Sequence, residues 1–145
     1  MTTLDAVNPM QTLHIQKQTQ IAAPLDIVFA TVLEPQGRLA EMSLKIEPWP
    51  GGRWYRDLGN NAGHLWGHVQ VIKPPTLLEL VGPMFMSYPA LSHVQYRLAA
   101  EGRGTLLTIT HQAIGLIARE HAEGVTKGWE EILGSIRTAA EKKSR

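Results

Sequence analysis

Six histidines are the side chains of this 145-residue sequence best suited to metal binding or acid–base chemistry. His64 and His68 share one face of a predicted strand but stand roughly 13 Å apart, too far to hold one ion. His111 is in phase with apolar strand residues, and His121 begins the apolar face of the last predicted helix. These two could approach each other, but zinc usually takes three or four protein ligands, and no third is evident. The sequence therefore predicts no metal site and favours core histidines bonded to backbone carbonyl groups.

His111 and His121 are also the candidates for catalysis, because a side chain in a dry cavity can serve as a general acid. Ser87, Ser92 and His93 are close in sequence, but no nucleophile elbow of the form G-x-S-x-G surrounds them. The sequence has no cysteine, no visible pair of inward carboxylates and no glycine-rich phosphate loop. It assigns no catalytic residue and no cofactor, and it leaves a catalytic role open.

Arg56 is the candidate for a charged anchor inside the protein. In RWYRDL, residues 53–58, the phase that turns Trp54 inward also turns Arg56 inward. A buried arginine needs a carboxylate, a carbonyl group or an anionic ligand. The opposite phase turns Tyr55 inward and leaves Arg56 in solvent, and periodicity alone leaves both phases open.

The segment GPMFMSYPALSH, residues 82–93, is unusually apolar for a connection between strands. Met84, Phe85 and Met86 are consecutive, and methionine adapts to ligands of varied shape. Three interpretations are open for this segment. It forms the rim of a cavity, it fills the core as an edge strand or bulge, or it makes a homodimer contact.

Periodicity indicates the elements that must position these residues. Alternation predicts a first strand over 12–21, and apolar residues at helical spacing predict a helix over 24–33. Strand and turn signals fill residues 44–114, and the stretch 91–114 forms a hairpin. Residues 117–142 return to helical spacing. Consecutive strands with short connections must be antiparallel, so we expect an α+β fold whose terminal helix covers one face of the sheet.

The last predicted helix carries three glycines in EHAEGVTKGWEEILGS, residues 120–135. Each interior glycine costs roughly 0.5–1 kcal/mol relative to alanine. On a helical wheel Gly128 lies within the buried sector and Gly124 at its edge, whereas Gly134 points the opposite way. We expect the first two to leave volume between helix and sheet. The alternative is close helix–sheet packing without a usable void.

Two tryptophans are assigned to opposite sides of the sheet. Trp129 falls in the buried sector of the last helix with Val125, so we expect both to face the sheet. Trp66 falls in the strand phase opposite to Leu65 and Val69. The alternation therefore predicts Trp66 on the outer face or at an edge.

Composition excludes several classes of protein. The formal charge is +1 without a basic stripe, which argues against nucleic-acid binding. No run approaches the roughly 18 apolar residues of a membrane span, and the N-terminus lacks the pattern of a signal peptide. We therefore expect a cytoplasmic protein that does not insert into membranes. Its predicted organisation is a flexible leader over 1–11, one domain over 12–142 and a basic tail over 143–145.

Six short motifs occur in register: IAAPLDIVFATV, PGGRW, GHVQVIKPPTLLEL, SHVQYRL, GTLLTITHQAIG and EGVTKGW. Over residues 13–140 the chain resembles the START/SRPBCC (Bet v 1-like) superfamily. The closest subgroup is the one named after the C-terminal domain of the heat-shock-protein-90 ATPase activator. The resemblance implies a helix-grip fold, in which a curved antiparallel sheet of six to seven strands wraps around the long C-terminal helix. Short helices follow the first strand, and relatives bind lipids, sterols, polyketides or hormones or, in a minority, are cyclases or hydrolases.

The residues and the resemblance together favour a protein that binds a small hydrophobic or amphipathic molecule in a cavity between sheet and helix. The alternatives are a cyclase or hydrolase that uses the same cavity, and a protein-interaction module, either a homodimer or co-chaperone-like. The residues expected to line the cavity are Trp54, Arg56, Phe85, Met86, Tyr96, His111, His121, Val125 and Trp129.

Overall fold

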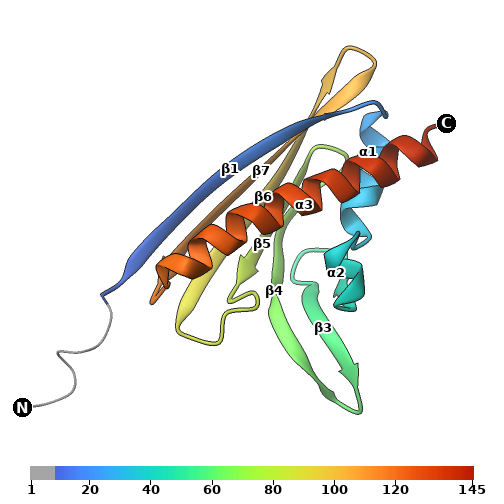
Figure 1. The fold of residues 1–145 in the computed structure, drawn as a ribbon. Coiled ribbons are helices and arrows are strands. Elements are labelled where there is room, and N and C mark those ends of the chain that lie inside the picture. Colours follow the sequence, from blue (N-terminus) through green and yellow to red (C-terminus); the bar gives the residue numbers. More distant parts are fainter. Residues whose placement is uncertain (1–8) are drawn as a thin grey trace, which may run out of the picture.

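The computed structural model describes residues 9–145, which form one seven-stranded sheet and three helices (Figure 1). The elements follow the order β1 (Gln11–Ile21), α1 (Leu25–Leu33), α2 (Arg38–Glu41), β2 (Leu44–Ile46), β3 (Arg53–Gly59), β4 (Ala62–Lys73), β5 (Leu77–Gly82), β6 (Ala90–Glu101), β7 (Gly104–Gly115) and α3 (Arg119–Lys143). The strand order in the sheet is β1-β7-β6-β5-β4-β3-β2, and every neighbouring pair is antiparallel. The predicted α+β helix-grip fold is confirmed. Of the predicted leader, residues 1–8 lie outside the described part of the chain.

The long strands β1, β7 and β6 form the regular half of the sheet. β1 pairs with β7 from Gln11 opposite Gly115 to Ile21 opposite Thr105 without a register shift. Along β7 buried side chains alternate with more accessible ones, as expected for a sheet with one covered face. His111 belongs to the buried set, which is the phase that the sequence predicted.

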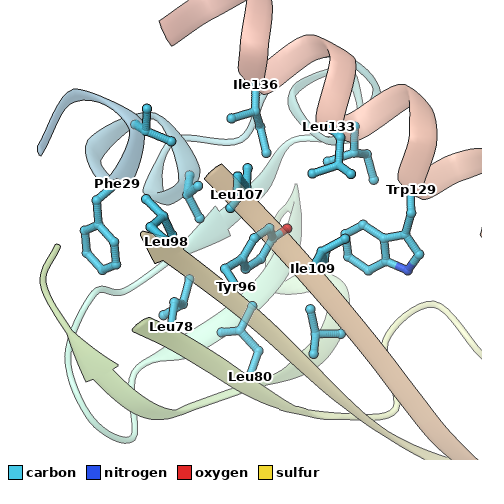
Figure 2. Packing of buried hydrophobic residues seen from close by; sticks show 14 of the residues in the cluster. Phe29, Leu78, Leu80, Tyr96, Leu98, Leu107, Ile109, Trp129, Leu133 and Ile136 are labelled. Atoms are coloured by element: carbon cyan, nitrogen blue, oxygen red, sulfur yellow. The ribbon is translucent and has the colours of Figure 1, made fainter. Parts of the chain in front are cut away.

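Helix α3 crosses the concave face of the sheet (Figure 1). Its side chains Trp129, Leu133 and Ile136 point toward the strands, where they meet Tyr96 of β6 and Ile109 of β7 among others (Figure 2). Each fully buried aliphatic or aromatic side chain of this kind contributes about 1.5–3 kcal/mol to folding. The core therefore lies between the middle and C-terminal part of α3 and the β5–β7 strands.

Helices α1 and α2 lie against the C-terminal half of α3 (Figure 1). Glu141 of α3 accepts a hydrogen bond of 2.9 Å from the backbone N–H of Ala22, just before α1. Lys143 pairs with Glu34 at 3.2 Å just after α1. These contacts fix the C-terminal end of α3, whereas its first turns face the connection between β5 and β6.

Strand β4 departs from simple alternation at Trp66. The register of β3 and β4 shifts between Trp54, opposite Gly67, and Tyr55, opposite Leu65, so Trp66 is an additional residue in a β-bulge. Trp66 is consequently 3% exposed, while Leu65 is 45% exposed. The prediction that Trp66 lies on the outer face is therefore wrong, because the bulge inverts the inward and outward positions on either side of it.

Candidate functional site

A pocket of about 360 Å³ lies between the N-terminal half of α3 and the β3–β4 part of the sheet, and it is partly open to solvent. Helix α3 contributes one face at helical spacing, and α2, β3, β4 and the β5–β6 connection close the other sides. The lining residues are Arg38, Leu39, Met42, Trp54, Trp66, Met84, Phe85, His121, Gly124, Val125, Gly128, Trp129 and Ile132. Most of these side chains are apolar, so the pocket suits an apolar guest.

Two glycines of α3 keep the helix side of the pocket empty. A Cβ atom built on Gly124 or Gly128 would meet no atom within 4 Å, apart from its own neighbouring helix backbone. Neither glycine is therefore needed for close contact with a strand. Gly134 also has free space around it, but it is exposed and lies outside the pocket. Gly124 and Gly128 both line the pocket, so the lack of a side chain at these positions leaves free volume on its helix side.

Aromatic rings form the sheet side of the pocket. The ring centroids of Trp54 and Trp66 are 5.2 Å apart in an edge-to-face arrangement, and Phe85 lies 5.6 Å from Trp66. Such pairs gain about 0.5–1.5 kcal/mol beyond the burial of their area. The indole nitrogen Nε1 of Trp66 is buried and has no hydrogen-bond partner within residues 9–145.

A buried chain of hydrogen bonds holds the ring of Trp129. Its indole N–H donates to Nδ1 of His111 at 2.9 Å, and Nε2 of His111 lies 3.0 Å from Oγ of Ser92. Because Nδ1 accepts, the neutral imidazole carries its proton on Nε2 and donates it to Ser92. Burial lowers the pKa of His111 to about 4, so the ring is neutral at physiological pH.

A second histidine lies at the edge of the pocket. Nδ1 of His121, in the first turn of α3, is 2.6 Å from the hydroxyl oxygen of Tyr88 in the β5–β6 connection. The Phe85 ring packs edge-on against the imidazole, with centroids 5.0 Å apart. Burial raises the pKa of Tyr88, so its hydroxyl stays protonated at neutral pH. The hydrogen bond joins the β5–β6 connection to α3.

The charged group in the pocket lining is already paired. Nη2 of Arg38, on α2, lies 2.7 Å from Oε2 of Glu131 on α3, and both side chains are more than half exposed. An exposed ion pair of this kind contributes about 0–1 kcal/mol. It links α2 to α3 at the end of the pocket opposite His121.

The sequence comparison decides the family. The family model described as "Activator of Hsp90 ATPase homolog 1-like protein" (AHSA1) matches residues 22–141, which is most of the chain. The chain belongs to this family. AHSA1-like proteins are part of the SRPBCC superfamily, so the resemblance stated from the six motifs is confirmed. Among curated proteins, none matches the sequence.

Several solved structures share the fold of this chain. An uncharacterised protein from Rhizobium leguminosarum aligns with a TM-score of 0.72 at 17% identity, covering 92% of this chain and 97% of that chain. CalU16 from Micromonospora echinospora aligns with a TM-score of 0.61 at 25% identity, covering 90% of this chain and 81% of that chain. DynU16, from the dynemicin biosynthetic locus, aligns with a TM-score of 0.67 at 18% identity, covering 90% of this chain and 48% of its own.

In this AHSA1-like chain the structure brings five of the nine expected residues together around the pocket. They are Trp54, Phe85, His121, Val125 and Trp129. The other four, Arg56, Met86, Tyr96 and His111, do not line the pocket.

Tyr96 and His111 lie in the core beneath the pocket. The Tyr96 ring packs edge-on against Trp129 with centroids 6.1 Å apart, and burial raises the pKa of its hydroxyl. His111 contacts the pocket through Trp129. Met86 is buried but does not line the pocket.

Arg56 follows the predicted phase that turns Trp54 inward, but its side chain is only partly buried. It pairs across β2 and β3 with the buried Leu44, so its side chain begins on the covered face. The side chain is half buried and lines a shallow cleft at the β3–β4 hairpin instead of the pocket. Its Nε is buried without a hydrogen-bond partner in the described part of the chain.

Several lining residues of this AHSA1-like pocket were not in the predicted set. Leu39 lies in α2, a single helical turn, and Met42 caps its C-terminal end. Their i, i+3 spacing is the available signal. Trp66 is brought into the pocket by the β4 bulge, which periodicity does not show. Met84 has a left-handed backbone with φ of 58° that turns its side chain into the wall.

Metal centres and membrane-spanning helices are two other kinds of functional feature. Within residues 9–145, no three His, Cys, Asp or Glu side chains gather into a group that could hold a metal ion. Across the same range, no helix combines the length and the apolar character that a membrane crossing requires.

Proposed function

We propose that this AHSA1-like protein binds a small hydrophobic or amphipathic molecule in the pocket between α3 and the sheet. The observation that supports this proposal is the empty volume next to Gly124 and Gly128, bounded by apolar walls. A volume of about 360 Å³ lies within the usual range for ligand sites. The helix would be more stable with alanine at both positions, so the glycines fit a requirement for space.

The affinity would come from burial of apolar ligand surface. Each 100 Å² removed from water contributes about 2.5 kcal/mol before the entropic costs of binding. The rings of Trp54, Trp66 and Trp129 present rigid surface, so little side-chain entropy is lost when a ligand packs on them. Polar groups at the two ends, His121 and Arg38, would orient an amphipathic ligand.

The test compares two glycines of the same helix. Gly128→Leu fills the pocket, whereas Gly134→Leu adds the same side chain to the exposed face. We expect the first variant to bind the neutral fluorescent probe 1-N-phenylnaphthylamine at least ten-fold more weakly, and the second to bind it like the wild type. Circular dichroism confirms that both are folded. Equal affinities in all three proteins would overturn the proposal.

Native mass spectrometry of the protein from a heterologous host would identify a retained ligand.

A catalytic role in the same pocket is the second candidate, and His121 is the observation that favours it. His121 lines the pocket and is hydrogen-bonded to Tyr88, whereas both nitrogens of His111 have protein partners. A cyclase or hydrolase would lose turnover by orders of magnitude in His121→Ala while keeping probe affinity. A binding protein would show no turnover to lose.

A homodimer is the third candidate, and an exposed apolar pair supports it. Leu91 and Ile114 are partners across β6 and β7 on the outer face, and both are about half exposed. In the β5–β6 connection, by contrast, Met84 and Met86 are buried, so these two side chains do not offer a surface for a second copy of the chain. Light scattering of the wild type and Ile114→Asp separates this candidate from the others.

The absence of cysteine from the sequence supports a cytoplasmic location as a further part of the proposal.

A further inference from the structure

The indole N–H of Trp66 is a donor without an acceptor in the wall of an apolar pocket. Trp66 is 3% exposed, and its Nε1 has neither water access nor a partner within residues 9–145. Buried N–H groups of native proteins are almost always hydrogen-bonded, because leaving one unpaired costs free energy. Trp129, in the same pocket, follows this rule by donating to His111. The donor of Trp66 is therefore an exception that needs an explanation.

The surroundings hold the Trp66 ring in place. The ring packs against Trp54 and Phe85, and the backbone carbonyl of Trp66 accepts a hydrogen bond of 2.8 Å from the N–H of Met84. The bulge at Trp66 sits against Gly67 and Gly82, where a Cβ on either glycine would overlap the backbone of the neighbouring strand. A donor fixed in this way can select a ligand by the position of one atom.

We infer that Trp66 is a specificity-determining residue that donates its indole N–H to a neutral acceptor of the bound molecule, such as a carbonyl or ether oxygen. The ligand class is a flat apolar molecule with one such acceptor. This inference rests on the proposed binding function and adds the chemistry of the ligand to it. Indole is a donor only, so a molecule without an acceptor gains nothing from it.

A neutral acceptor fits the charges of the pocket better than an anionic one. The lysine and arginine side chains that line it within residues 9–145 are limited to Arg38, which is paired with Glu131. An anion buried beside Trp66 would lack a free cation, and an unpaired buried charge is strongly disfavoured. A carbonyl or ether oxygen needs only the hydrogen bond.

Phe85 is the side chain that would move to admit the acceptor. Its ring packs against both Trp66 and His121, and it lies in a turn outside the strands β5 and β6. Phe85 is also only partly buried, so its ring can rotate toward solvent without leaving a hole in the core. The acceptor would then occupy the volume that the Phe85 ring leaves against the ring of Trp66.

The experiment uses two probes of nearly the same shape, 2-acetylnaphthalene and 2-ethylnaphthalene, of which only the first has a carbonyl group. Each displaces 1-N-phenylnaphthylamine from the wild type, from Trp66→Phe and from the control Trp49→Phe, in which an exposed tryptophan is changed. For each protein we take the ratio of its affinities for the two probes. The hydration of the free probes is the same in every titration, so it cancels when these ratios are compared between proteins. We expect Trp66→Phe to lower the preference for 2-acetylnaphthalene about two- to ten-fold and Trp49→Phe to leave it unchanged.

Nuclear magnetic resonance of the wild type gives a readout that does not depend on the folding of Trp66→Phe. The chain has four tryptophans, and their indole N–H signals are assigned in isotope-labelled wild type by through-bond and through-space correlations, without any substitution. The Trp66 signal should move downfield with 2-acetylnaphthalene and not with 2-ethylnaphthalene. An equal response to both probes, or an unchanged affinity ratio in Trp66→Phe, overturns this inference while binding itself stands. If neither probe displaces the dye from the folded wild type, the proposed binding function fails as well.

Discussion

The indole N–H of Trp129 donates a hydrogen bond of 2.9 Å to Nδ1 of His111, and this bond ties α3 to β7 beneath the pocket. The bond fixes the tautomer of His111 and the orientation of a ring that forms part of the pocket wall. Because both groups are buried, neither can exchange its partner for water. The shape of the pocket and the protonation of His111 are therefore linked.

The first prediction concerns pH. Burial lowers the pKa of His111 to about 4, against 6.5 for an ordinary histidine. Between these values the unfolded chain binds a proton that the folded chain does not, so the free energy of unfolding falls as the pH falls from 6.5 to 4. Below pH 4 this contribution is constant. The total loss is about 3 kcal/mol, at 1.36 kcal/mol per pH unit.

Urea unfolding of the wild type and His111→Gln at several pH values measures this loss. Protonation of carboxylates whose pKa values are lowered, such as Glu47 and Asp57, also makes the protein less stable in acid. Only the difference between the two proteins therefore reports on His111. His14→Gln, at an exposed site, is the matched control. A wild-type curve that stays parallel to that of His111→Gln would contradict the prediction.

The second prediction concerns the pairing of Trp129 with His111. His111→Leu leaves the indole N–H without an acceptor and should cost about 1–3 kcal/mol for that group alone. Combining it with Trp129→Phe removes the orphaned donor. The double variant should therefore be more stable than the sum of the two single losses predicts, by about 1–2 kcal/mol. Strict additivity in denaturant unfolding would show that the hydrogen bond does not couple the two residues.

The third prediction concerns the bond between Tyr88 and His121. Tyr88→Phe removes the hydroxyl that joins the β5–β6 connection to the first turn of α3. The net loss in global stability should be about 0.5–1.5 kcal/mol. Amide hydrogen exchange should accelerate in residues 119–125, which depend on this contact, and not in residues 132–140, which are held by the core.

Tyr55→Phe on β3 is the control for this variant, because the Tyr55 ring stacks with Arg53 away from α3. Unchanged exchange at the start of α3 in Tyr88→Phe would mean that the first turn is held by other contacts.

The fourth prediction separates stability from binding at the helix glycines. Gly128→Ala and Gly134→Ala should each stabilise the unliganded protein by about 0.5–1 kcal/mol, since the new methyl group meets no atom within 4 Å in either case. Only Gly128→Ala should weaken binding of 1-N-phenylnaphthylamine, because only this methyl group enters the pocket. Thermal unfolding and a fluorescence titration measure the two effects. If Gly128→Ala destabilises the protein, the space beside this glycine is not free.

The sequence by itself determined the succession of elements. Period-two alternation predicted β1 and the hairpin of β6 and β7, and helical spacing predicted α1 and α3, since both patterns follow from which side chains one face can bury. Short connections required antiparallel pairing. The same patterns indicated free volume at Gly124 and Gly128, because a wheel shows which face of α3 lacks side chains.

Only the tertiary structure decided which residues meet around that volume. The β4 bulge brings Trp66 into the pocket through a register shift against β3, and register depends on the partner strand as much as on the strand itself. Tyr96 and His111 share the inward phase with pocket residues, yet the ring of Trp129 lies against both of them. Periodicity reports the face on which a side chain lies, whereas depth and neighbours are set by how helix and sheet pack in three dimensions.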